Sequence, residues 1–274
     1  MVSQGKNGPT APGSVIDGKR VREVIPVRGI RRTLAEHMYR SLQESAQLST
    51  STGVDMTQMI RCRQALNSKE EQSGIHYTWT DLFVKIAAEA LRLVPIMNSS
   101  LVGKEIIIWD DINIGVALDF QLRDGRRGLI VPVVRNADKK SLREIHSELE
   151  VFKEKGRAGK LMPDDTAGGT FTITNTGALA ASRPPQKGIA TGMASFSTPI
   201  LNQPQVGIWG MGGYSDTPVV VDGQVVIRPV MYYSLTYDHR VLTGADAAAF
   251  IEVLHRLMLN PDPLLLGNQG SPSG

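Results

Sequence analysis

The sequence predicts an α/β protein in which helices pack on one face of a mixed β-sheet, in two layers. Long segments with helical spacing of apolar residues are interspersed with segments rich in β-branched residues, and the two kinds do not alternate as a regular strand–helix repeat. No internal repeat is visible, and 274 residues suit one large domain or two small ones.

Helices are predicted where apolar residues recur every three to four positions. Most of these segments follow a Ser, Thr or Asp that can cap the first turn, and Glu144 lies three residues after Ser141, as in a capping box. The predicted helices cover residues 31–42, 57–68 after Asp55 and Thr57, 81–93 after Thr80, 142–158 and 245–259.

Strands are predicted where β-branched and aromatic residues form short runs between turn residues. Pro132, inside the run 128–134, indicates an edge strand or a bulge. Asp222-Gly223 is typical of a two-residue hairpin turn. Residues 122–127 are predicted to form a second, polar hairpin turn. The predicted strands cover residues 47–56, 105–109, 113–118, 128–134, 169–174, 206–211, 219–221, 225–227 and 230–236.

The two ends of the chain differ from its middle in composition. Residues 1–22 and 268–274 are polar and rich in Gly, Pro and Ser, so we expect a flexible linker and a flexible tail around a folded domain at 23–267. No apolar run is long enough for a transmembrane helix, and no apolar signal-peptide core is present. We therefore expect no membrane partner.

A net charge of +3 is too small to indicate nucleic-acid binding. Basic residues do cluster between Lys19 and Arg32. This cluster is compatible with a solvated face, a membrane-surface patch or an anion site, and composition alone favours the solvated face.

The single cysteine, Cys62, cannot form an internal disulfide, which suits a reducing compartment. It lies in a helical pattern between two arginines that could lower its pKa, but a thiol on a helix face is the simpler interpretation.

Two other segments imitate functional motifs. The glycine-rich run 207–213 continues into a strand and not a helix, so it is no dinucleotide site, and Asp138-Lys139-Lys140 precedes a helix and is no lipoylation turn.

Asp238-His239-Arg240 follows the predicted strand 230–236, and a glycine follows at Gly244. A histidine at the end of a strand, leading into a turn, is well placed for proton transfer. A lone histidine is more often structural, so this reading depends on the rest of the chain.

Several motifs, in one order along the chain, resemble the catalytic domain of the acyltransferase (E2) component of 2-oxoacid dehydrogenase complexes. This family shares its fold with chloramphenicol acetyltransferase. The resemblance covers about Val24 to Gly267 and rests on agreement in order more than on any single motif. The matching segments are 28–38, 95–100, 113–117, 128–138, 169–175, 199–205 and 238–244.

The resemblance implies transfer of an acyl group between the thiols of dihydrolipoamide and coenzyme A. It implies that His239 is the general base and that Thr174 donates a hydrogen bond to the oxyanion. Thr243 stands where the family usually has Asp or Asn, and offers only a hydroxyl as support. Coenzyme A is then a substrate, and no metal is required. No lipoyl domain is recognised, so the lipoyl group would be carried by a separate domain or chain.

The resemblance also implies a homotrimer with His239 and Thr174 contributed by different chains. Trimers would assemble into a cubic or larger core that works with a lipoyl domain and with the E1 and E3 components, in the cytoplasm or the mitochondrial matrix. The leucines of 264–266 are expected to be exposed and to join trimers. An insertion of roughly a dozen residues, centred on 182–190, is either a tolerated surface loop or reshapes the site.

Two alternative functions remain open at this point. The substitution at Thr243 and the insertion are compatible with a catalytically weakened oligomeric scaffold for partner enzymes. A transferase acting on a small hydroxyl or amine acceptor would have the same fold. The sequence does not distinguish acetyl, succinyl and branched-chain acyl groups.

Overall fold

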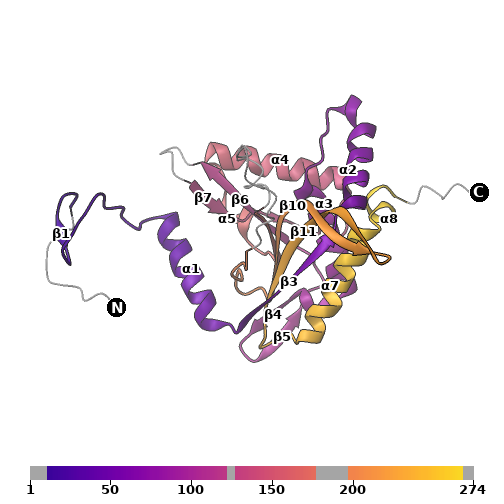
Figure 1. Ribbon diagram of the computed structural model, residues 1–274. Helices are drawn as coiled ribbons and strands as arrows, with labels where there is room; N and C mark the ends of the chain where they lie inside the picture. The colour runs from indigo at the N-terminus through magenta and orange to yellow at the C-terminus, as the bar shows by residue number, and fades with distance from the viewer. Residues whose placement is uncertain (1–10, 122–126, 177–196, 268–274) are drawn as a thin grey trace, which may run out of the picture. The chain divides into compact units, whose positions relative to one another are not determined.

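The computed structural model describes residues 11–121, 127–176 and 197–267 (Figure 1). The predicted turn at 122–127 falls largely outside these ranges, and the predicted insertion at 182–190 and tail at 268–274 fall entirely outside them. Contacts divide the chain into two compact units, residues 1–37 and 38–274. The domain limits expected from composition stay a prediction.

The first unit contains a small antiparallel hairpin, β1 (Val15–Ile16) and β2 (Lys19–Arg20), within the predicted linker. Helix α1 (Ile30–Glu44) begins in this unit and continues into the second, and it confirms the helix predicted over 31–42. The basic residues of the hairpin are exposed, which fits the solvated face favoured by composition.

The second unit is built on a seven-stranded mixed sheet. Its main strand order is β3-β11-β10-β9-β6-β7, with β8 paired to β6. β9 runs parallel to both β10 and β6, and the other neighbours are antiparallel. The strands are β3 (Gln47–Asp55), β6 (Ile114–Gln121), β7 (Arg127–Ile130), β8 (Val133–Val134), β9 (Phe171–Asn175), β10 (Gly207–Val221) and β11 (Gln224–Asp238).

Within the described residues, helices α2, α3, α4 and α7 form the second layer. Helix α4 contacts α3, α3 contacts α7 and α7 contacts α2, and α3, α4 and α7 also contact strands. This confirms the predicted two-layer α/β class. The capping box of Ser141 and Glu144 is confirmed, with the serine hydroxyl accepting from the Glu144 amide. The helices are α2 (Thr57–Lys69), α3 (Trp79–Leu93), α4 (Leu142–Ala158) and α7 (Gly244–Leu259), with short α5 (Pro163–Thr166) and α8 (Asp262–Leu265).

The local structure differs from the predicted elements in detail at three places. The cap of α3 is Thr78 and not Thr80: Thr78 forms a capping box with Asp81, and the Thr80 hydroxyl accepts from Asn175. Pro132 divides the predicted strand 128–134 into β7 and β8. Residues 99–102 form an unpredicted strand, β4 (Ser99–Val102), which pairs with β5 (Glu105–Ile108) outside the main sheet.

The hairpin predicted at Asp222-Gly223 is confirmed. Both residues have positive φ, 50° and 78°, as the favoured two-residue hairpin turns require. The short strands predicted on each side of the turn are joined into two long ones. Residues 206–211 and 219–221 fall largely in β10, and 225–227 and 230–236 fall in β11, and the two strands pair with each other from Gly207 to the turn. The glycine-rich run 207–213 lies inside β10, as expected.

The core lies between the sheet and the helices and is filled by large aromatic side chains, including the buried Trp209, Tyr233 and Phe171. Cys62 belongs to this core, and burial raises the pKa of its thiol to about 12, which confirms a helix-face thiol and argues against a nucleophile.

Leu265 is buried and its two leucine neighbours pack on the same core, so the expectation of three exposed leucines was wrong. Among the described helices, none has the length and apolar character needed to cross a bilayer.

Candidate active site

His239 follows the last residue of β11, and its backbone is fixed while its ring is exposed. The His239 amide donates to the carbonyl of Ala46, 2.8 Å away, at the point where the chain enters β3. The imidazole lies beside the Tyr237 ring, with centroids 5.8 Å apart, and makes no hydrogen bond within the part of the chain that the structure describes. Its nitrogens are therefore available to a ligand.

The residues on either side of His239 form an ion pair. Oδ2 of the buried Asp238 accepts from Nη2 of Arg240 at 2.6 Å, and its carboxylate also accepts from Nε and from the Arg240 amide. Burial alone would raise the pKa of Asp238, but the hydrogen bonds from Arg240 hold this pKa below its usual value. Asp238 is thus a fixed anion at the start of the turn.

The same carboxylate also reaches the neighbouring strand. The Ala46 amide donates to Asp238 Oδ1 at 3.3 Å, while the Ala46 carbonyl accepts from His239. Ala46 is therefore held at both of its backbone groups by the residues of the histidine turn. Sequence reasoning missed this contact, since the two partners are 192 positions apart and no local pattern marks them.

A second unpredicted network lies next to this junction. Gln47, paired in register with Asp238, accepts from the Leu201 amide at 3.1 Å and donates to the carbonyl of Ser41. The buried Ser41 hydroxyl donates to the Leu201 carbonyl at 2.7 Å. These bonds fix the segment around Leu201 to the beginning of β3.

Thr174 lies in the middle of the sheet, on β9 between β6 and β10. It is level with Ala117 on one side and with Gly210 on the other. Its side chain is half-buried, and its hydroxyl has no hydrogen-bond partner among residues 11–121, 127–176 and 197–267. A hydroxyl placed in this way can donate to a bound group.

Thr243 is the N-cap of helix α7. Its hydroxyl accepts from the Asp246 amide at 3.3 Å and donates to Asp246 Oδ2 at 2.6 Å, and its own amide donates to the same carboxylate at 2.8 Å. The structure therefore gives Thr243 a capping role. Support of His239 by this hydroxyl stays a prediction.

The structure does not bring His239 and Thr174 together within one chain. Thr174 and Ser234 are both level with Gly210, and His239 lies five residues beyond Ser234 along β11. Five residues of strand and two inter-strand spacings separate the two by roughly 20 Å. The two side chains cannot act on one bond in a single chain.

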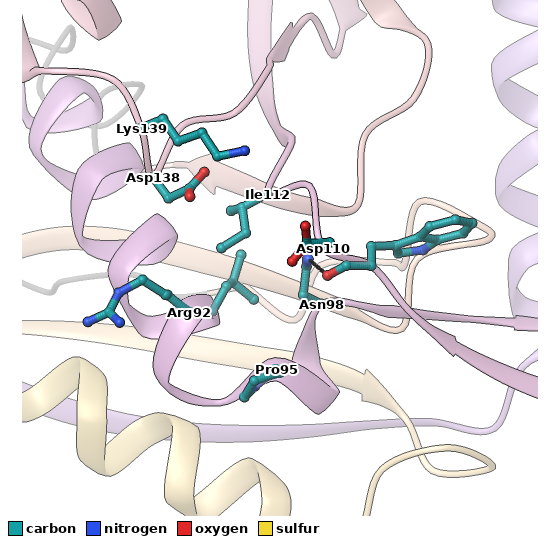
Figure 2. A pocket seen from close by; sticks show the side chains of 9 residues that line it. Arg92, Pro95, Asn98, Asp110, Ile112, Asp138 and Lys139 are labelled. Carbon is teal, nitrogen blue, oxygen red and sulfur yellow. Dashed lines mark hydrogen bonds between the residues drawn. The ribbon is translucent and has the colours of Figure 1, made fainter.

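A pocket of about 180 Å³ lies elsewhere, at the C-terminal end of α3 (Figure 2). Asn98 and Asp138, both from segments that carry the family resemblance, line it, and Oδ1 of each is buried without a hydrogen-bond partner among the described residues. The Asn98 amide nitrogen donates to the carbonyls of Trp109 and Asp111, which explains the need for asparagine there. The pocket contains neither His239 nor Thr174.

The family model described as 2-oxoacid dehydrogenases acyltransferase (catalytic domain) matches residues 19–266. Relatives from Haemophilus influenzae and Azotobacter vinelandii are 34% and 36% identical over 90% and 91% of this chain. Both are named as the dihydrolipoyllysine-residue succinyltransferase component of the 2-oxoglutarate dehydrogenase complex. The chain spans 56% and 58% of their lengths.

Two solved structures are similar over nearly the whole chain. One is Azotobacter vinelandii dihydrolipoamide acetyltransferase, with a TM-score of 0.80 and 31% identity over 94% of this chain and 99% of that one. That structure concerns the role of a serine, a histidine and an asparagine in the catalytic mechanism of the acetyltransferase. The other is the cubic core of a pyruvate dehydrogenase multienzyme complex, with a TM-score of 0.79, 31% identity and the same coverage. The chain therefore belongs to the family of 2-oxoacid dehydrogenase acyltransferase catalytic domains.

Proposed function

We propose that this chain transfers an acyl group between the thiols of dihydrolipoamide and coenzyme A, as the core of a 2-oxoacid dehydrogenase complex. The observation that carries the proposal is the placement of His239, whose backbone is fixed on both sides while its ring is open to a ligand. Membership of the family supplies the reaction class.

His239 is proposed as the general base. Thiols ionise near pH 8.5 and only a small fraction is thiolate at neutral pH, so removing the proton during attack accelerates the reaction. The imidazole takes the proton of the attacking thiol, and the sulfur adds to the thioester carbonyl. When the tetrahedral intermediate collapses, the other carbon–sulfur bond breaks and the imidazolium returns the proton to the departing thiolate.

Thr174 is proposed as the oxyanion donor, contributed by a second copy of the chain. In the acetyltransferase structure a serine precedes the named histidine by 52 positions, whereas Thr174 precedes His239 by 65. The difference of 13 agrees with the insertion expected between Asn175 and Pro199. The separation of roughly 20 Å within one chain, estimated from strand geometry, supports a contribution from a second copy.

Succinyl is proposed as the acyl group. The support is the naming of the Haemophilus influenzae and Azotobacter vinelandii relatives, 34% and 36% identical, as succinyltransferase components. The lipoyl group would be presented by a domain outside the described residues or by a partner chain, alongside the E1 and E3 components, and the transfer itself uses no metal.

Thioester formation from dihydrolipoamide with succinyl-, acetyl- and isobutyryl-coenzyme A tests the proposal, with unaltered protein beside His239→Ala. We expect turnover, fastest with the succinyl donor, and a loss of at least about a hundredfold in the variant. His76→Ala, at an exposed histidine far along the chain, is the matched control and should keep full activity. Equal rates for the His239 variant and the unaltered protein would refute the proposed base.

One observation favours a second candidate, a catalytically weakened scaffold. The acetyltransferase study names an asparagine four positions after the histidine, where this chain has Thr243. The Thr243 hydroxyl is engaged by Asp246 and so does not replace an amide that could reach the histidine. Normal assembly without turnover for any of the three donors would establish this second function.

A further inference from the structure

A row of small residues crosses the sheet at the level of Thr174. In the strand register, Ala117 of β6 lies on one side of Thr174 and Gly210 of β10 on the other. Ser234 of β11 and Ser51 of β3 continue the row. Adjacent strands lie about 4.8 Å apart, so Ala117 and Gly210 are the nearest cross-strand neighbours of the proposed oxyanion donor. We call this set the small-residue row.

The small-residue row lies on the face of the sheet that the helices do not cover. Ile173 is buried in the core between sheet and helices, and side chains alternate along a strand, so Thr172 and Thr174 lie on the opposite face. A Cβ on Gly115 would lie 3.0 Å from the Thr172 hydroxyl, which places Gly115 on this face too. Ala117 follows two positions later in β6 and therefore shares the face of Thr174.

Two positions around Thr174 are covered. A Cβ on Gly210 would lie 3.1 Å from Cγ of Pro199, so the proline ring packs over this glycine. A Cβ on Gly115 would lie 2.9 Å from Cγ1 of Val131, so the valine packs over the beginning of β6. Neither position has room for a further group.

The segment that carries the proline is anchored to the sheet at both ends. The Ser197 carbonyl accepts a hydrogen bond from the buried Ser234 hydroxyl. The Thr172 hydroxyl donates to Oε1 of the buried Gln205 at 2.6 Å. Pro199, which lies between these two bonds in the sequence, is therefore a fixed wall beside the proposed donor.

Among the residues that the structure describes, Ala117 is the neighbour of Thr174 that is left open. Ala117 and Thr174 are both half-buried, whereas Gly210 is buried under Pro199. An oxyanion held by the Thr174 hydroxyl lies about 3 Å from it, and the acyl carbon is bonded to that oxygen. Because Pro199 closes one side, the room for the atoms attached to this carbon lies over the Ala117 methyl group.

We propose that Ala117 sets the size of the acyl group that this chain transfers. Its methyl group forms the floor beneath the acyl chain of a thioester held by Thr174, and a floor this small leaves room for a chain as long as succinyl. A branched side chain at the same position fills that room and leaves space for acetyl only. The inference rests on the proposed function, because it takes Thr174 as the oxyanion donor.

Ala117→Val, Ala117→Gly and Ser51→Val in the full chain test this inference. Ser51→Val is the matched control, because it enlarges an exposed small residue at the far end of the row. The kcat/KM of each variant is measured with succinyl-, isobutyryl- and acetyl-coenzyme A. We expect Ala117→Val to lower the ratio of succinyl to acetyl kcat/KM at least about tenfold, because added methyl groups in an acyl site discriminate to this degree. Ala117→Gly should raise the ratio of isobutyryl to acetyl, and the control should keep both ratios.

These ratios separate a role in specificity from a structural one. A loss of stability or assembly lowers kcat/KM for the three donors together and leaves their ratios unchanged. Circular dichroism checks folding, and if Ala117→Val does not fold, the opposite shift in Ala117→Gly decides the inference. Unchanged ratios in the folded Ala117 variants would overturn it.

Binding measurements distinguish this inference from the proposed function. Ketone analogues of succinyl- and acetyl-coenzyme A, with a methylene between sulfur and carbonyl, retain the carbonyl oxygen and cannot transfer the acyl group. Calorimetry gives the Kd of each analogue. An unaltered protein that binds the analogues without catalysing exchange counts against the proposed function, yet a Kd ratio that Ala117→Val shifts toward acetyl by about tenfold still supports the role of Ala117. An unshifted Kd ratio, or no binding of either analogue, contradicts that role.

Discussion

Asp238 and Arg240 form an ion pair across His239 in the sequence, with Oδ2 of the aspartate 2.6 Å from Nη2 of the arginine. The aspartate is buried and the arginine is partly exposed, so the pair has one desolvated and one hydrated end. Asp238 also accepts from the Ala46 amide, so one carboxylate fixes both the turn and the beginning of β3. The backbone position of the proposed base thus depends on a buried carboxylate in the preceding residue.

Asp238→Asn should weaken this arrangement without removing it. The amide still accepts a hydrogen bond, but the charged bonds to Arg240 are lost, at a cost of about 1–2 kcal/mol after allowing for the exposed end of the pair. We expect kcat to fall more than tenfold through misplacement of His239, with a smaller change in KM. Urea unfolding and steady-state kinetics measure the two effects. A variant with unchanged kcat would show that the pair is purely structural.

The same aspartate gives a pH dependence of defined sign. Its folded-state pKa lies below its unfolded value, so the unfolded chain binds the extra proton and stability falls as the solution becomes more acidic. The contribution is complete above the unfolded value of about 4 and is lost as the pH falls through the folded value. The difference in unfolding free energy between the unaltered protein and Asp238→Asn should therefore shrink below about pH 4. A constant difference would contradict this assignment.

His255 gives a second pH dependence, in a higher range. Burial lowers its pKa, its Nε2 has no hydrogen-bond partner among the described residues, and its ring lies 5.7 Å from that of Tyr233. Because the folded-state pKa is depressed, stability is complete above the unfolded value of about 6.5 and declines as the pH falls below it. His255→Leu should flatten the stability profile between about pH 5 and 7 relative to the unaltered protein. Urea midpoints across this range are the measurement.

Close packing in the sheet leads to a prediction about two glycines. A Cβ on Gly207 would lie 2.6 Å from the ring of the buried Phe171, whereas a Cβ on Gly244 meets no atom within 4 Å. Gly207→Ala should therefore cost about 1–3 kcal/mol through overpacking. Gly244→Ala, the matched control in the first turn of α7, should be neutral or slightly stabilising because it reduces the freedom of the unfolded chain. Similar unfolding midpoints for the two variants would contradict the close contact.

Local elements of this fold could be predicted because their causes are local. The capping box of Ser141 and Glu144, the turn at Asp222-Gly223 and the interruption at Pro132 each follow from residues close in sequence. The cap of α3 was misplaced by two positions, because Thr78 and Thr80 are equally good caps and the contact of Thr80 with Asn175 forms only in the folded protein.

The residues of the candidate site stay a prediction, and the contacts that support His239 were not predicted. The histidine turn marks His239 in the sequence, and the family resemblance adds Thr174. The bonds from Asp238 to Ala46 and from Gln47 to Leu201 join residues 192 and 154 positions apart, and no local spacing encodes them. The resemblance implied that His239 and Thr174 lie on different chains, and the strand register adds the distance of roughly 20 Å between them within one chain.

Mixed assemblies provide the last and most direct prediction. His239→Ala and Thr174→Ala should each be nearly inactive, because each lacks one half of every site. If a site takes its histidine from one chain and its threonine from the next, random co-assembly of the two variants restores both residues in about a quarter of the sites. Co-expressed variants should then show about a quarter of the activity of the unaltered protein.

The matched control is co-assembly of His239→Ala with the double variant His239→Ala, Thr174→Ala, which contains no intact histidine and should remain inactive. Restored activity above this control would place the reacting groups on different chains, as the separation of roughly 20 Å within one chain requires. A mixture that assembles fully and stays at the level of the control would instead mean that Thr174 does not act with the histidine of a neighbour, and that another donor stabilises the oxyanion.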